Sequence, residues 1–254
     1  MVYMPTEPRQ KSMKSRSQKP SISKRKEAFS SNKCQIFAVV FDMDGVIVDN
    51  MEYHKKAWGV FLKKYAPDVE LEGFSRHFGK VNKDLLKIVF KREVSAREEA
   101  RFGEEKEAIY REIYTDHIVP TAGLVDFLNS LKKNEVKMAV ATAAPRVNMD
   151  FVFEMTGLRE YFDVLIDASE VMKGKPDPEI YLKAADKLNC PPESCIVFED
   201  SMPGIEAAQN AGMKVIALAT SHPAERLQSA ERVVKDFTEI RVDSVRDFLF
   251  TTGQ

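Results

Sequence analysis

The run IFAVVFDMDGVIVDN occupies residues 36–50 and decides the fold of this 254-residue chain. Its first part, IFAVVF (36–41), is continuous, apolar and rich in β-branched and aromatic residues. Such a run is typical of a parallel strand that is buried on both faces. Two aspartates, Asp42 and Asp44, and then Gly45 follow at once. Asp and Gly are common turn residues, but two acids directly after a buried strand can also face one pocket.

Three later runs resemble this strand, and helical patterns separate them. The strand runs are VKMAVAT (136–142), CIVFE (195–199) and KVIAL (214–218). The helical patterns cover residues 123–133, 178–189 and 203–213. This alternation predicts an α/β fold with a doubly wound, parallel-sheet, Rossmann-like core. In such sheets ligands bind at the carboxyl ends of the strands, which is where the acidic residues of this chain lie.

Residues 50–118 interrupt the alternation. Helical spacing appears in 52–65, 83–92 and 104–118, with no strand run between them. The pattern predicts a small all-helical cap inserted after the first strand. We therefore expect three parts: a basic tail at 1–33, a core built from 34–49 and 119–254, and a helical cap at 50–118.

Composition restricts the partners that the chain can have. Hydrophobic residues make up 44% and the formal net charge is −1, so charge gives no general argument for binding nucleic acid or membrane. No apolar run reaches 18 residues, and we expect no transmembrane helix. The three cysteines (Cys34, Cys190, Cys195) lack metal-ligand spacing, which favours reduced thiols in the cytoplasm.

The tail at residues 1–33 is basic, rich in serine and without apolar periodicity. It cannot bury a core, so we expect it to be disordered. A basic, serine-rich and acid-poor N-terminus is also the composition of a transit peptide. An organelle therefore stays open as an alternative to the cytoplasm.

Several motifs resemble those of the haloacid dehalogenase-like hydrolase superfamily, in the same order along the chain. FDMDGVIVDN (41–50) is similar to its first motif, and Thr142 ends a strand run as the second-motif hydroxyl residue does. GKPDPEIY (174–181) contains a lysine like that of the third motif, and VFEDSMPGIEAAQNAGM (197–213) resembles the acidic fourth motif. EYHKKAW (52–58) and the helical cap are similar to the β-phosphoglucomutase-like and sugar-phosphatase branch.

The resemblance implies roles for individual residues. Asp42 would be the nucleophile that forms an aspartyl-phosphate, and Asp44 the general acid and then base. Thr142, Ala143 and Lys175 would bind the phosphoryl group. An acid at position 44 argues against the dehalogenase and phosphonate-hydrolase branches, which leaves phosphate-ester transfer.

A Mg²⁺ site is implied by the same resemblance. Its ligands would be Asp42, Asp200, the backbone carbonyl of Asp44, and Glu199 directly or through water. Mg²⁺ prefers such hard oxygen ligands. An alternative for Glu199 and Asp200 is an N-cap pair ahead of the next helix, and capping is compatible with ligation.

Four cap positions are candidates for substrate contacts. His54 lies where mutase-like members have a hinge histidine, although a lone helical histidine is more often ordinary. Lys106 matches a substrate-reaching lysine, but the charge run at 91–107 favours a solvated helix face. Asn82 lies where mutases grip a second phosphate with arginine, and it is flanked by Lys80 and Lys83. Substitution of the arginine by one of these lysines, as a point charge after a shift of the loop, stays open as an alternative.

Two departures from the mutase pattern favour hydrolysis. Asn82 stands in place of that arginine, and Ala144 in place of a serine. Asparagine does not replace the bidentate grip of arginine on phosphate. We therefore expect a Mg²⁺-dependent phosphatase acting on a small phosphorylated metabolite, a sugar or polyol phosphate, with no nucleic-acid or membrane partner. The alternatives are a β-phosphoglucomutase and a non-catalytic phosphate-binding module.

Overall fold

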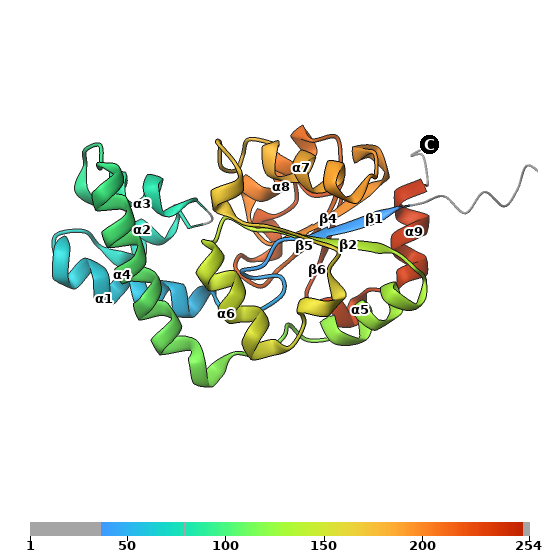
Figure 1. The fold of residues 1–254 in the computed structure, drawn as a ribbon, viewed down its shortest axis with the longest axis horizontal. Coiled ribbons are helices and arrows are strands. Elements are labelled where there is room, and N and C mark those ends of the chain that lie inside the picture. Colours follow the sequence, from blue (N-terminus) through green and yellow to red (C-terminus); the bar gives the residue numbers. More distant parts are fainter. Residues whose placement is uncertain (1–36, 79, 251–254) are drawn as a thin grey trace, which may run out of the picture. The chain divides into compact units, whose positions relative to one another are not determined.

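Six strands form one parallel sheet within residues 37–78 and 80–250, the part of the chain that the computed structural model describes (Figure 1). Their order across the sheet is β3-β2-β1-β4-β5-β6. The strands are β1 (Ala38–Phe41), β2 (Lys137–Ala141), β3 (Val164–Ile166), β4 (Cys195–Glu199), β5 (Lys214–Leu218) and β6 (Arg232–Val234). The chain builds one half of the sheet outward from β1 and then returns to β4. The point where the strand order reverses therefore lies between β1 and β4, and ligands bind at such a point.

Helices cover both faces of the sheet, because alternate residues of β1 point to opposite sides. Val39 and Phe41 belong to one buried cluster and Ala38 and Val40 to another. The first cluster includes residues of α5 (Leu124–Lys133), α6 (Arg146–Thr156) and α9 (Val242–Phe250). The second includes residues of α7 (Glu179–Leu188) and α8 (Met202–Asn210). Figure 1 shows these helices on the two sides of the sheet. The predicted doubly wound α/β fold is confirmed.

Four of the helices between β1 and β2 share a hydrophobic core of their own. They are α1 (Met51–Tyr65), α2 (Leu71–Ser75), α3 (Asn82–Phe90) and α4 (Ala96–Tyr114). Trp58 is fully buried at the centre of this cluster and meets Phe61 and Phe74 edge to face. The separate core explains how this all-helical insertion packs as a cap.

Single turns of 3₁₀ helix complete the described chain. They are η2 (Thr115–His117), η3 (Arg159–Tyr161), η4 (Ala168–Glu170), η5 (Pro192–Ser194), η6 (Ala224–Arg226) and η7 (Phe237–Glu239). The predicted tail at residues 1–33 lies outside the described residues. Among the described helices, none is long and apolar enough to cross a membrane.

Two glycines have left-handed backbone conformations, one in a crowded position and one in open space. Gly123, at the start of α5, has φ 77°, and a Cβ built there would lie 2.6 Å from the backbone nitrogen of Thr238. Gly157, after α6, has φ 69° with open space around it.

We expect Gly157→Ala to lower the free energy of unfolding by about 1–2 kcal/mol, the cost of the left-handed conformation. Gly123→Ala should cost more, about 3 kcal/mol, because the backbone beside it must also move.

Urea unfolding followed by circular dichroism measures both variants against the wild type. The Gly157 variant is the matched control for conformational strain alone. Equal losses in the two variants would show that the approach of Gly123 to Thr238 imposes no constraint.

Candidate active site

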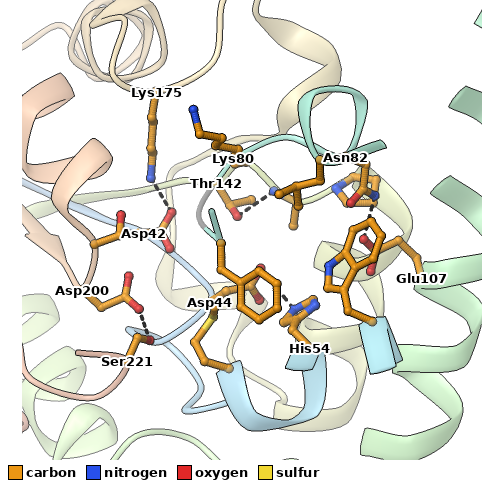
Figure 2. Close-up of a pocket in the computed structure, with 18 of the residues that line it drawn as sticks. Asp42, Asp44, His54, Lys80, Asn82, Glu107, Thr142, Lys175, Asp200 and Ser221 are labelled. Atoms are coloured by element: carbon orange, nitrogen blue, oxygen red, sulfur yellow. Dashed lines mark hydrogen bonds and ion pairs between the residues drawn. The ribbon is translucent and has the colours of Figure 1, made fainter. Parts of the chain in front are cut away.

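The carboxyl ends of β1 and β4 bring two acids onto one buried ammonium group. Asp42 directly follows β1, and Glu199 ends β4, which pairs with β1. The Lys175 Nζ donates to Asp42 Oδ1 at 2.6 Å and to Glu199 Oε1 at 2.6 Å. Figure 2 shows the Lys175 side chain extending toward Asp42. All three side chains are buried, so this is a low-dielectric site in which charges interact strongly.

The buried acids outnumber the cations that neutralise them. Burial raises the pKa of Asp42 to about 7, with Lys175 opposing the shift and Glu199 and Asp44 adding to it. Burial, followed by the charges of Glu199 and Asp42, also raises the pKa of Asp200 well above its ordinary value. Asp200 is held by a hydrogen bond from the Ser221 hydroxyl. The cluster therefore has an excess of negative charge that a bound cation would offset.

The donor set fits a hard divalent cation such as Mg²⁺. Asp42, Glu199 and Asp200 each offer an oxygen, and these atoms lie within 4.8 Å of one another. Carboxylate oxygens in small number, leaving room for water, are the ligands that Mg²⁺ prefers.

Glu199 differs from the other two acids because protein donors already surround it. Its Oε1 accepts from Lys175 and from the Tyr181 hydroxyl at 3.0 Å. Its Oε2 accepts from the backbone nitrogens of Asp200 and Ser201 at 2.7 and 2.8 Å and from the Ser201 hydroxyl at 3.0 Å. The N-cap of α8 is Ser201, whose hydroxyl accepts from the backbone of Gly204. Glu199 thus orients Lys175 and the turn that carries Asp200.

Asp44 faces the pocket from the turn after β1, and residues of the cap hold it. Asn50 donates to Asp44 Oδ1 at 2.6 Å, and His54 Nε2 lies 3.6 Å from Asp44 Oδ2. Burial acts to raise the pKa of Asp44, but its polar neighbour His54, the hydrogen bond from Asn50 and the charge of Lys106 hold the pKa below its ordinary value. The carboxylate form of Asp44, which accepts a proton, is therefore favoured.

The end of β2 supplies a hydroxyl beside Asp42. Thr142 is buried, and its Oγ1 accepts a hydrogen bond from the backbone nitrogen of Ala144 at 3.0 Å. A hydroxyl that accepts this bond can still donate its own hydrogen. Thr142, Ala143 and Lys175 line one pocket together with Asp42 and Asp44. The predicted phosphate-binding residues are thus brought together around the predicted nucleophile.

The cap candidates line the same pocket. His54, Lys80, Asn82 and Lys106 are all part of its wall. The His54 ring stacks on Tyr110, with centroids 3.8 Å apart, and its Nδ1 lies 2.8 Å from the Lys106 Nζ. An ammonium group only donates, so Nδ1 is the acceptor and the ring proton is at Nε2, facing Asp44. Lys106 thereby selects the tautomer of His54.

The prediction that Lys106 lies on a solvated helix face is wrong. Its side chain is only 2% exposed. Lys106 points toward α1, where its Nζ lies 5.3 Å from the Trp58 ring centroid. The Nζ also lies 3.0 Å from Glu107 Oε1 on the same helix, α4. Charged residues occur all around α4, so composition does not reveal which of them faces inward.

Sequence reasoning missed several residues of the site. One of them is the buried acid Glu107, which accepts from Asn82 Nδ2 at 2.7 Å and from Asn148 Nδ2 at 2.6 Å. Burial acts to raise the pKa of Glu107, but the charge of Lys106, the nearby His54 ring and the two amide hydrogen bonds hold the pKa below its ordinary value. The other missed residues are Asn50, Tyr110, Tyr181 and Ser221. No motif contains Glu107; only the structure reveals that it faces the pocket.

Curated relatives of this chain include phosphatases. It is 32% identical to the phosphorylated carbohydrates phosphatase of Thermotoga maritima, over 70% of this chain and 83% of the relative. It is 29% identical to the chloroplastic 5-amino-6-(5-phospho-D-ribitylamino)uracil phosphatase of Arabidopsis thaliana, over 82% of this chain. In that case the match spans 57% of the relative's length.

Solved structures share the fold. The β-phosphoglucomutase of Clostridium difficile superposes with a TM-score of 0.75 at 28% identity, covering 84% of this chain and 97% of that one. The predicted enzyme class, a phosphoric monoester hydrolase, agrees with the phosphatase relatives. A model of the haloacid dehalogenase-like hydrolases matches residues 36–212. The chain belongs to the haloacid dehalogenase-like hydrolase family.

Proposed function

We propose that this chain is a Mg²⁺-dependent phosphatase that hydrolyses a small sugar or polyol phosphate through an aspartyl-phosphate on Asp42. The observation that carries the proposal is the Asp42 carboxylate. It lies at the end of β1, it is held by Lys175 at 2.6 Å, and it lines one pocket with Asp44, Thr142 and Asp200. That arrangement offers a nucleophile, a proton carrier and donors for the phosphoryl oxygens in one place.

In the first step, an oxygen of Asp42 attacks phosphorus in line with the leaving oxygen. The new bond joins Asp42 to phosphorus, and the bond to the leaving oxygen breaks. Asp44 in its protonated form gives that oxygen a proton. Lys175 and Thr142 are placed to hold the phosphoryl oxygens as negative charge develops. A bound Mg²⁺, with Asp42 and Asp200 as its carboxylate ligands, would supply further charge neutralisation.

In the second step, water attacks phosphorus and the bond to Asp42 breaks. The carboxylate of Asp44 takes the proton of the water, so the residue ends the cycle protonated again. The low pKa of Asp44 favours this acceptor form. Splitting the reaction into two displacements lets one carboxylate serve as acid and then as base.

The likeness to a β-phosphoglucomutase keeps mutase activity as the alternative. Two contacts favour hydrolysis. The Asn82 amide donates to Glu107, and Ala144 offers only its backbone at the turn after β2. A mutase must hold a second phosphate, and neither side chain supplies the charge for that.

We also propose a cytoplasmic location, with an organelle as the alternative if residues 1–33 act as a transit peptide. The cysteines of the described chain, Cys190 and Cys195, are buried free thiols, in agreement with a reducing compartment. Imaging of the chain with a fluorescent protein at its C-terminus distinguishes the two locations.

The activity is tested by measuring phosphate release from a panel of sugar, polyol and nucleotide monophosphates with Mg²⁺. A coupled assay for conversion of β-glucose 1-phosphate to glucose 6-phosphate runs beside it. We expect release from sugar or polyol phosphates without isomerisation. Isomerisation faster than release would establish the mutase instead.

Replacing the nucleophile should abolish turnover. We expect Asp42→Asn to leave no detectable phosphate release, because an amide is a poor nucleophile, while circular dichroism shows an unchanged fold. Asp49→Asn, which alters an exposed acid of the same loop, is the matched control and should keep wild-type activity. Near-normal turnover by the Asp42 variant would contradict covalent catalysis.

Replacing the proton carrier should slow the reaction without stopping it. We expect Asp44→Asn to lower kcat by about 10²–10⁴-fold, the usual contribution of general acid–base catalysis. The same Asp49 variant serves as the control. A wild-type kcat would remove Asp44 from the mechanism.

Metal dependence has two independent readouts. We expect EDTA to abolish turnover and Mg²⁺ to restore it. By calorimetry, Asp200→Asn should bind Mg²⁺ at least about tenfold more weakly than the wild type, because it loses a charged ligand. Full activity after chelation, or unchanged Mg²⁺ affinity, would refute the assignment of the ion.

A further inference from the structure

The cap contributes a charged carboxylate to the wall of the active-site pocket. Glu107 is only 3% exposed, and three hydrogen-bond donors surround its carboxylate. Its Oε1 accepts from Asn82 at 2.7 Å and from Lys106 at 3.0 Å, and its Oε2 accepts from Asn148 at 2.6 Å. Buried acids with this many donors stay ionised, and the lowered pKa of Glu107 agrees. The Glu107 carboxylate, paired with Lys106 at 3.0 Å, therefore contributes acceptor oxygens to the pocket wall on the side of α4.

Glu107 also determines what its neighbour can offer to a ligand. A carboxylate only accepts hydrogen bonds, so the Asn82 amide nitrogen must point toward Glu107. Asn82 lies at the start of α3 and lines the same pocket. Its amide oxygen is left as the atom that a ligand can approach, and this atom is again an acceptor. Acceptors suit the hydroxyl or amine groups of a ligand and repel phosphate oxygens.

Two of the three lysines that line this pocket in the described chain are already paired, and the third extends away from the wall. Lys106 lies between Glu107 and His54, and Lys175 lies between Asp42 and Glu199. The Lys80 side chain extends away from Asn82 and Glu107 in Figure 2. None of these three ammonium groups is therefore placed to hold a second phosphate beside Asn82.

A second groove, which is also lined by Asn82, is acidic as well. It shares Asn82 and Glu107 with the active-site pocket and adds Glu99 and Glu104. Lys83 is the one cation among the described residues that line it. A ligand that extends past Asn82 thus meets mainly negative charge.

We propose that Glu107 is a specificity-determining residue that excludes a second phosphate and selects monophosphates whose leaving group carries hydroxyl or amine groups. This proposal rests on the phosphatase function proposed above and specifies its substrate class. The physical cause is repulsion between phosphate oxygens and the acceptor oxygens of Glu107 and Asn82 in a desolvated pocket, which lowers the affinity for a second phosphate.

The test compares each monophosphate with the same sugar carrying two phosphates. The pairs are fructose 1-phosphate with fructose 1,6-bisphosphate, and glucose 6-phosphate with glucose 1,6-bisphosphate. For the wild type we expect kcat/KM to favour the monophosphate by at least about 100-fold, mainly through KM. Glu107→Gln should narrow that ratio at least about tenfold by removing the charge. Glu112→Gln, an exposed acid on the same helix, is the matched control and should leave the ratio unchanged.

The ratio does not depend on how much of a variant is folded, because both substrates are assayed on one preparation. A wild type that uses bisphosphates as well as monophosphates would overturn the proposal without any variant. An equal loss on both substrates in Glu107→Gln would also overturn it and would show a role in positioning Lys106 only. A wild type that hydrolyses neither monophosphate would instead count against the proposed sugar-phosphatase function.

Discussion

The rest of the site depends on one buried ion bridge, in which the Lys175 ammonium joins Asp42 to Glu199. Two ionised acids at adjacent strand ends would repel each other in a dry interior, and a shared cation turns this repulsion into attraction. The bridge is possible because β1 and β4 are neighbours at the point where the sheet reverses its strand order. Glu199 is held in turn by Tyr181 and by the start of α8. The sheet topology thus brings the acids together, and the Lys175 ammonium offsets the repulsion between them.

A second polar chain couples this cluster to the cap. It runs from Asp44 through His54 and Lys106 to Glu107, and it returns to the core at Asn148 on α6. Each member is fixed by its neighbour: Lys106 selects the tautomer of His54, and His54 lowers the pKa of Asp44. The residues that set the protonation of Asp44 therefore also line the pocket in which the proposed substrate would bind. In the proposed mechanism, this arrangement would link the choice of leaving group to the protonation of its oxygen.

The core was predictable because buried parallel strands leave an unmistakable apolar run. Cys195–Glu199 and Lys214–Leu218 form strands with the bounds that their sequence indicates. The edge strands Val164–Ile166 and Arg232–Val234 were not predicted, because three residues are too short to show a pattern. Motif residues could be inferred from family resemblance. Glu107 could not, since its burial follows from the packing of α4 against α1 and α6 rather than from its neighbours in sequence.

The stereochemical course at phosphorus tests the central claim most directly. A phosphate ester made chiral at phosphorus with oxygen isotopes is turned over in water of a distinct isotope, and the configuration of the released phosphate is measured. Attack by Asp42 followed by attack of water gives two in-line displacements, each of which inverts phosphorus. The account therefore predicts net retention of configuration. Net inversion would show that water attacks the ester directly and would contradict an aspartyl-phosphate on Asp42.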